Sequence, residues 1–202
     1  MDPKSEFFIR AFDLKDETRT GWELRGIRDP ESVADHSWGT ALLCLVYADE
    51  AQVDASRAVE IAVVHDLAEA ITGDIARRVD TDAQTRSDTE KARLEAEAMD
   101  NLIEGWDGRR VQDLWLEYEQ RSSPEALFVR DMNLLDMCLQ ALKYEQNRRY
   151  ETGAPNANFL DFPRLDEFFA TSEPRFSTAV GRRMFQDVKT RYETVRDSAR
   201  GD

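Results

Sequence analysis

The chain has two histidines, His36 and His65, and each stands beside an aspartate, in Asp35-His36 and in His65-Asp66. Imidazole nitrogen and carboxylate oxygen form a donor set suited to Mn, Fe, Co, Ni or Zn, whereas Ca and Mg prefer oxygen alone. These residues could therefore hold a divalent transition metal. The alternative is that they make ordinary ion pairs at the protein surface.

The residues around the second histidine bear on that choice. Glu69 follows His65 by four residues and Asp66 by three, so on a continuous helix the three side chains share one side. Apolar residues flank the cluster, in Val63-Val64 and Leu67-Ala68. Burying two carboxylates with an imidazole is unfavourable unless a cation or full hydrogen bonding compensates. From this pattern alone, a metal and a set of surface ion pairs are equally reasonable.

The helices expected around the histidines favour the metal. Apolar periodicity predicts one helix over residues 29–51 and a second over residues 54–73, so the histidines lie on consecutive antiparallel helices. Gly39 and Thr40 follow the first histidine, and their small size permits a close approach of a neighbouring helix. We therefore expect both imidazoles to face one buried cation.

Helical periodicity dominates the rest of the chain, and no segment shows the alternation typical of a β-strand. Residues 18–30 are expected to form an ordered loop and residues 74–89 a long surface loop. Lys91 and Glu95 are placed on the outward face of the helix that begins at Thr89. Further helices are expected over residues 3–14, from 111, and over 124–150, 164–171 and 175–199. The fold class is an all-α orthogonal bundle forming one domain.

Composition limits the function. With 202 residues, 41% hydrophobic and 34% charged, the chain is too apolar to be disordered and too charged for a membrane protein. A net charge of −14 argues against a nucleic-acid polymer as partner, but a few local arginines or a metal can still bind a small phosphorylated ligand. The N-terminus has no signal-peptide pattern, so we expect a cytoplasmic protein without membrane contact.

The longer strings around the histidines resemble a known family. His36, then His65-Asp66, then acids and an amide near Asn133 resemble the HD-domain metal-dependent phosphohydrolases. The strings ESVADHS at residues 31–37 and VHDLAEAITGDI at residues 64–75 resemble its 5'-deoxynucleotidase branch. The resemblance implies a single HD domain over residues 1–202, with its core at about 7–170 and a C-terminal helix at about 175–199.

The same resemblance implies a function. It predicts one divalent metal (Mn, Co, Fe or Zn) and hydrolysis of deoxynucleoside 5'-monophosphates to deoxynucleoside and phosphate. It also predicts a nucleotide as the small-molecule partner and a homodimer as the assembly.

Four positions match the family's metal ligands. His36, His65 and Asp66 match three of them, and the fourth, an aspartate in the family, falls on Asn133. An amide oxygen can bind a metal but brings no charge, so we expect weaker metal binding, altered substrate choice or lost catalysis. Asp131 cannot take its place, because two residues along a helix turn the side chain by about 200°.

Further positions match residues that act on the substrate. Glu69 and Asp74 match two acids that flank the phosphate and the attacking water. Trp22 matches a tryptophan that shapes the nucleotide site. In the family an arginine near that tryptophan contacts the phosphate. In one form of the family it directly precedes the tryptophan, where this chain has Gly21, so Arg19 is the candidate substitute.

Two other functions compete with the hydrolase. Asn133 favours an inactive HD domain that binds a nucleotide or serves as a structural protein. A di-iron HD oxygenase is disfavoured, because such a site needs more than two histidines.

Overall fold

Helices make up the regular structure of the residues that the computed structural model describes, namely 2–152, 156–159, 161–162 and 164–198. Within these ranges there is no β-strand, and one isolated bridge joins Thr18 to Ser32. The α-helices are α1 (Pro3–Ala11), α2 (Thr20–Arg25), α3 (Val33–Ala51), α4 (Ala55–Val64), α5 (Glu69–Thr72), α6 (Asp88–Leu102), α7 (Arg109–Gln120), α8 (Pro124–Gln146), α9 (Asp166–Ser172) and α10 (Ala179–Ser198). Short 3-10 helices are η1 (Phe12–Lys15), η2 (Thr81–Ala83), η3 (Ala157–Phe159) and η4 (Glu173–Arg175).

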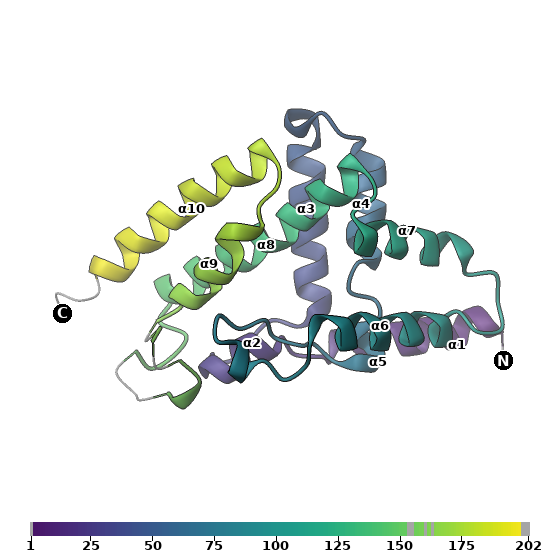
Figure 1. Ribbon diagram of the computed structural model, residues 1–202, viewed down its shortest axis with the longest axis horizontal. Coiled ribbons are helices and arrows are strands. Elements are labelled where there is room, and N and C mark those ends of the chain that lie inside the picture. Colours follow the sequence, from purple (N-terminus) through teal and green to yellow (C-terminus); the bar gives the residue numbers. More distant parts are fainter. Residues whose placement is uncertain (1, 153–155, 160, 163, 199–202) are drawn as a thin grey trace.

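Helix α8 is the centre of the bundle. It packs against α3, α4 and α10, and apolar side chains are buried along its whole length, as expected for a helix surrounded by others. Figure 1 shows α3 standing across the layer formed by α1, α5 and α6, with α10 lying along α8. The all-α orthogonal bundle is therefore confirmed. Among the described residues, no helix combines the length and apolar character needed to cross a bilayer.

Helix α3 begins at a capping box rather than at residue 29. The Ser32 side chain accepts a hydrogen bond from the Asp35 backbone, and the Asp35 carboxylate accepts one from the Ser32 backbone. Asp29 has a left-handed backbone with φ of 46°, which keeps it outside the helix. The cap fixes the first turn of α3, and His36 lies directly after it.

The single helix predicted over residues 54–73 is wrong. Helix α4 ends at Val64, residues 65–68 form tight turns, and α5 follows. The Nδ1 atom of His65 hydrogen-bonds the carbonyl oxygen of Ala62 at 2.7 Å, an oxygen that would otherwise accept from the amide of Asp66. The histidine side chain thus replaces a helical hydrogen bond and ends the helix where chemistry is expected.

The loops are partly as predicted. Residues 18–30 contain helix α2, which the prediction of a loop missed because six residues with a glycine give little periodicity. Gly26 ends α2 in the left-handed conformation, with φ of 78°. Residues 74–87 do form a loop, apart from η2, but they line a cavity as well as the surface.

Candidate active site

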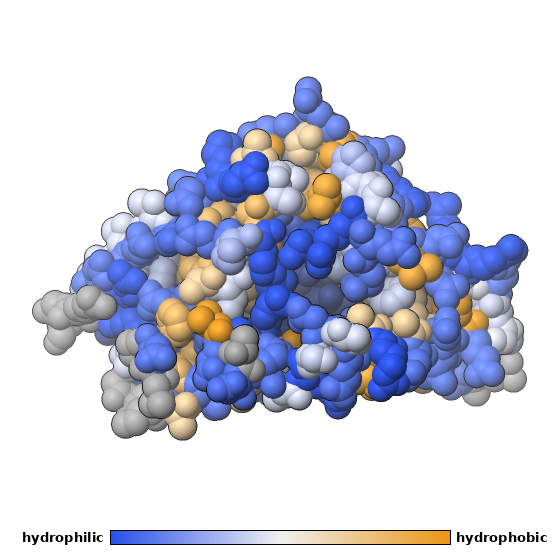
Figure 2. All heavy atoms as spheres, viewed as in Figure 1, coloured by the Kyte–Doolittle hydropathy of each residue, from blue (hydrophilic) through white to orange (hydrophobic). Residues whose placement is uncertain are grey.

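A cavity of about 440 Å³ opens beside the break between α4 and α5. Its walls come from α2, the 65–69 turn, the loop before α6, and helices α6 to α9. Figure 2 shows hydrophilic residues gathered around a hollow near the centre of this face. The volume lies in the range typical of small-molecule sites.

His36 and His65 lie close together, as the sequence predicted, and His65 lines this cavity. Both are buried, and their ring centroids are 5.5 Å apart. The Nε2 atom of His36 lies 3.6 Å from Oδ2 of Asp66, and that of His65 lies 3.1 Å from the same oxygen. Neither Nε2 atom has a hydrogen-bond partner. Two buried nitrogens and a carboxylate oxygen therefore converge on one point.

The other nitrogen of each ring holds it in place. Nδ1 of His36 is 2.7 Å from Oδ2 of Asp136, and Nδ1 of His65 is held by the backbone. The approach of Asp136 depends on Gly39, since a Cβ there would lie 2.0 Å from the Asp136 Oδ1 atom. The small residue thus does permit a close helix approach. Anchored through Nδ1, both rings direct Nε2 toward Asp66.

Burial and neighbouring charges shift the pKa values of all three of these groups. Burial and the charge of Arg19 lower the pKa of His36 to about 3, so this ring is neutral. Burial would raise the pKa of Asp66, but the two imidazoles and Arg19 outweigh it and hold that pKa well below its usual range. Burial lowers the pKa of His65, but the charge of Asp66, together with the contacts to Asp66 and to the Ala62 backbone, outweighs burial and raises that pKa. A divalent cation would satisfy both unpartnered Nε2 atoms and the carboxylate, so the residues fit such an ion.

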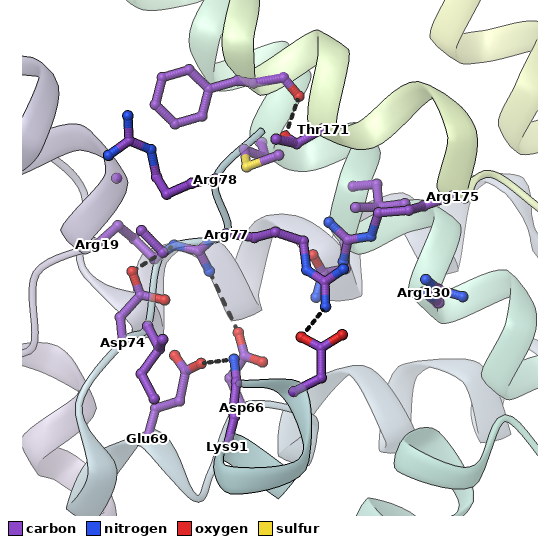
Figure 3. Close-up of a pocket in the computed structure, with 18 of the residues that line it drawn as sticks. Arg19, Asp66, Glu69, Asp74, Arg77, Arg78, Lys91, Arg130, Thr171 and Arg175 are labelled. Carbon is purple, nitrogen blue, oxygen red and sulfur yellow. Dashed lines mark hydrogen bonds and ion pairs between the residues drawn. The ribbon is translucent and has the colours of Figure 1, made fainter. Parts of the chain in front are cut away.

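Arg19, Asp74 and Glu69 lie beside this convergence point (Figure 3). The guanidinium of Arg19 is 3.5 Å from Asp66 Oδ2 and 3.9 Å from Asp74 Oδ2, so both contacts are longer than hydrogen bonds. Asp74 is fixed by the backbone amide of Thr20, which donates to its Oδ2 atom at 2.7 Å. Arg19 therefore keeps hydrogen-bond donors for an anion.

Glu69 is a buried acid with a perturbed pKa. Burial and the charges of Asp66 and Asp74 raise this pKa well above its usual range. Its Oε1 atom contacts Lys91 at 3.4 Å, while its Oε2 atom is buried without a partner. Lys91 also contacts Glu95 at 3.3 Å. The outward placement predicted for Lys91 and Glu95 is wrong, because α6 turns them into the cavity wall.

Asn133 and Asp131 occupy opposite sides of α8. The side-chain amide of Asn133 lines the cavity and donates from Nδ2 to the Tyr118 hydroxyl at 2.8 Å. Asp131 is buried elsewhere and accepts hydrogen bonds from the backbone of Ser177 and Thr178 before α10. The predicted rotation between them is present, and Asp131 serves to anchor α10.

Trp22 lies in the cavity wall and is 1% exposed. Its indole nitrogen donates to Glu31 at 2.9 Å, and Phe168 covers its ring with centroids 4.1 Å apart. A Cβ at Gly21 would lie 3.0 Å from the Phe168 ring, so an arginine there would need that ring to move. Arg19 reaches the cavity where position 21 has little room for a side chain.

Several residues that line or support the site were not predicted from the sequence. Asp136 had a signal, since it follows Asn133 by three residues and therefore shares its helix face. Arg77, Arg130 and Arg175 had none, because they come from a loop, a helix and a 3-10 turn far apart in the chain.

Comparison with known proteins gives a consistent result. Residues 11–164 match the family model described as HD domain. The chain is 42% identical to the human 5'-deoxynucleotidase HDDC2 over 175 residues, which is 85% of this chain and 78% of that protein. It is 38% identical to the zebrafish (Danio rerio) 5'-deoxynucleotidase HDDC2 over 179 residues, 87% of this chain and 81% of the relative.

Among solved structures, the PH0347 protein from Pyrococcus horikoshii OT3 superposes with a TM-score of 0.65 at 32% identity. The match covers 95% of this chain and 98% of that one. The family model covers residues 11–164, which include both histidines and Asp66, and each of these relatives matches most of the chain. The chain belongs to the HD domain family.

Proposed function

We propose that this protein is a metal-dependent phosphomonoesterase that hydrolyses deoxynucleoside 5'-monophosphates to deoxynucleoside and phosphate. One observation carries the proposal: two buried, unpartnered imidazole nitrogens converge with the Asp66 carboxylate beside a cavity of nucleotide-compatible size. The relatives named 5'-deoxynucleotidases supply the substrate class.

His36, His65 and Asp66 would hold one divalent transition metal, with the amide oxygen of Asn133 as the fourth ligand. Nitrogen donors favour Mn, Co, Fe or Zn over Mg or Ca. Because Asn133 donates from its nitrogen to Tyr118, its oxygen is the atom left for this role. The ion supplies positive charge to the phosphate oxygens and makes a water a stronger acid.

The remaining side chains have distinct tasks. Arg19 binds a phosphate oxygen through donors that its long contacts with Asp66 and Asp74 leave available. Asp74 orients the attacking water and takes its proton. Glu69, protonated because of its raised pKa, donates a proton to the 5'-oxygen as the phosphorus–oxygen bond breaks. Trp22, behind Phe168, limits the space for the sugar.

The direct test is phosphate release from a panel of deoxynucleoside and ribonucleoside 5'-monophosphates, each with Mn, Co, Fe and Zn. We expect release from deoxynucleotides with at least one of these metals. Metal analysis of the purified protein by mass spectrometry identifies the ion. No release across the whole panel would overturn the proposal.

Asn133 supports a second candidate, an HD domain that binds a nucleotide without hydrolysing it. The Asn133→Asp variant separates the two candidates, because it restores one negative charge among the metal ligands. If the unmodified chain is silent across the panel and the variant is active, the inactive domain is the better description. Asn133→Ala is the control for loss of the side chain alone.

A homodimer is also part of the proposal. Trp38, Leu42, Leu45 and Val46 are exposed on α3, and the first three are spaced to share one helix face. Exposed apolar patches of this kind mark interaction surfaces, and a second copy of the chain is the partner we propose. Light scattering should give twice the chain mass, falling to one chain for Leu45→Glu. Residence in the cytoplasm stays a prediction of the sequence.

A further inference from the structure

Several arginines line the cavity on the side away from Glu69 and Asp74. Figure 3 shows Arg77, Arg130 and Arg175 grouped on one side of the cavity, with Arg19 on the other. They come from the loop before α6, from α8 and from η4. All three line one cavity, and burial together with the charges of Arg77 and Arg130 lowers the pKa of Arg175 to about 10.

Two of these three arginines lack protein partners among the described residues. The side chains of Arg130 and Arg175 make no ion pair or hydrogen bond with another described residue, and the buried Nε atom of Arg175 has no acceptor. Arg77 pairs with Asp88 at 2.5 Å, but that aspartate is 78% exposed and solvent weakens the pair. The chain has 41 acids and 27 basic residues, so arginines without acidic partners are unexpected in it. An anion bound among them would offset their charge.

The cluster adjoins the proposed metal centre. Arg130 precedes Asn133 by three residues on α8, so both side chains share one helix face. Tyr118 accepts from Asn133, and its ring centroid is 5.1 Å from that of His65. Burial raises the pKa of Tyr118, and the charge of Arg175 partly opposes that rise. One small ligand can therefore contact the centre and the arginines together, because both line a single cavity.

We propose that Arg77, Arg130 and Arg175 form a second phosphate subsite, so that the preferred nucleotide carries a phosphate besides the 5'-phosphate at the metal centre. Guanidinium groups bind phosphate through paired, charge-assisted hydrogen bonds, and three of them around one anion suit two negative charges. This inference rests on the proposed function for the position of the first phosphate. Inorganic phosphate has the same chemistry, so the test must separate it from a nucleotide phosphate.

Calorimetric titration of the whole chain tests the subsite. The probes are deoxyadenosine 5'-monophosphate, its 5'-diphosphate, deoxyadenosine 3',5'-bisphosphate and inorganic phosphate, each with and without a chelator that prevents hydrolysis. With the chelator, we expect at least one two-phosphate nucleotide to bind about tenfold or more tightly than the monophosphate. Arg130→Gln and Arg175→Gln should abolish that gain and leave monophosphate affinity within about twofold.

Two variants are controls. Arg130→Lys keeps the charge and should keep part of the gain. Arg183→Gln removes a surface arginine that pairs with Glu50 outside the cavity, so it should bind every probe as the unmodified chain does. Thermal melting of each variant confirms that it is folded.

The outcomes separate this subsite from the proposed function. If neither two-phosphate nucleotide gains affinity, the nucleotide subsite is overturned; phosphate binding that depends on Arg130 would then assign the cluster to the free ion. A chain that hydrolyses monophosphates while the arginine variants change no affinity has the function without the subsite. A chain that hydrolyses nothing but loses the gain in Arg130→Gln has the subsite without the function.

Discussion

The two sides of the cavity differ in how their charges are held. Both imidazole rings, of His36 and His65, are fixed through Nδ1, and the carboxylate of Asp66 lies 3.1 Å from Nε2 of His65. Around Arg130 and Arg175, like charges lie together with few partners. The first side is arranged for a cation and the second for an anion. The rigidly held imidazoles therefore suit a role in catalysis, whereas the arginines with few acidic partners suit a role in binding an anion.

The largest expected effect comes from removing one of the two histidines. His65→Ala takes away one of two converging nitrogens and also the side chain that ends α4, so we expect loss of bound metal and activity below detection. Metal content after dialysis, with circular dichroism as a check of folding, measures this effect. Glu60→Ala, which breaks a surface ion pair on the same helix, is the control and should retain full metal content. Retention of the metal by His65→Ala would refute the ligand assignment.

Glu69→Gln separates proton donation from metal binding on the side of the cavity that holds the histidines. The amide keeps the shape but donates no proton to the 5'-oxygen, so kcat should fall by about 10²- to 10⁴-fold while bound metal is unchanged. The pH profile gives a further readout, because the acidic group responsible for its alkaline limb is absent in the variant. Full activity in Glu69→Gln would show that another group supplies the proton.

The features that could be predicted from the sequence are those that depend on local patterns. The all-α fold and most helices follow from apolar periodicity, which is a local property of the chain. His65 and Asp66 were found for a similar reason, since they sit in one short string. The helix break at residues 65–68 was not predicted, because the His65 side chain competes with the backbone for the carbonyl oxygen of Ala62. Apolar periodicity does not reveal such a hydrogen bond.

The arginine cluster shows the limit of local patterns. Arg77, Arg130 and Arg175 are separated by more than forty residues each, and they come together only in the tertiary structure, where all three line one cavity. Lys91 was assigned to the solvent because charged helix residues usually face water. Its position depends on buried acids of two different helices, Glu69 and Glu95. Such long-range charge pairing needs the tertiary structure.

Gly39→Ala tests how far the position of the His36 ring depends on Asp136. The added methyl occupies the position of the Asp136 carboxylate, so that carboxylate must rotate away from His36. Metal affinity should fall by about 10- to 100-fold, the usual effect of losing a partner behind a metal-binding histidine. Asp136→Ala should have a similar effect, and the double variant should be no worse than either single one. Additive losses would show that glycine acts elsewhere.

The smallest expected effect concerns Glu95 and the pH dependence of the free energy of unfolding. Burial raises the pKa of Glu95 to about 7 despite the nearby Lys91, while the unfolded chain keeps a value near 4.5. As pH rises between these values the unfolded chain loses the proton first, so this carboxyl stabilises the fold at low pH and that contribution is lost by about pH 7. Glu95→Gln removes the titration, so its free energy of unfolding relative to the unmodified chain should rise by about 1–3 kcal/mol from pH 5 to pH 8. Urea unfolding at both pH values measures the change, and the exposed Glu97→Gln on the same helix should show none. An equal pH dependence in both variants would mean that Lys91 keeps Glu95 ionised, and the cavity wall would then carry one more negative charge.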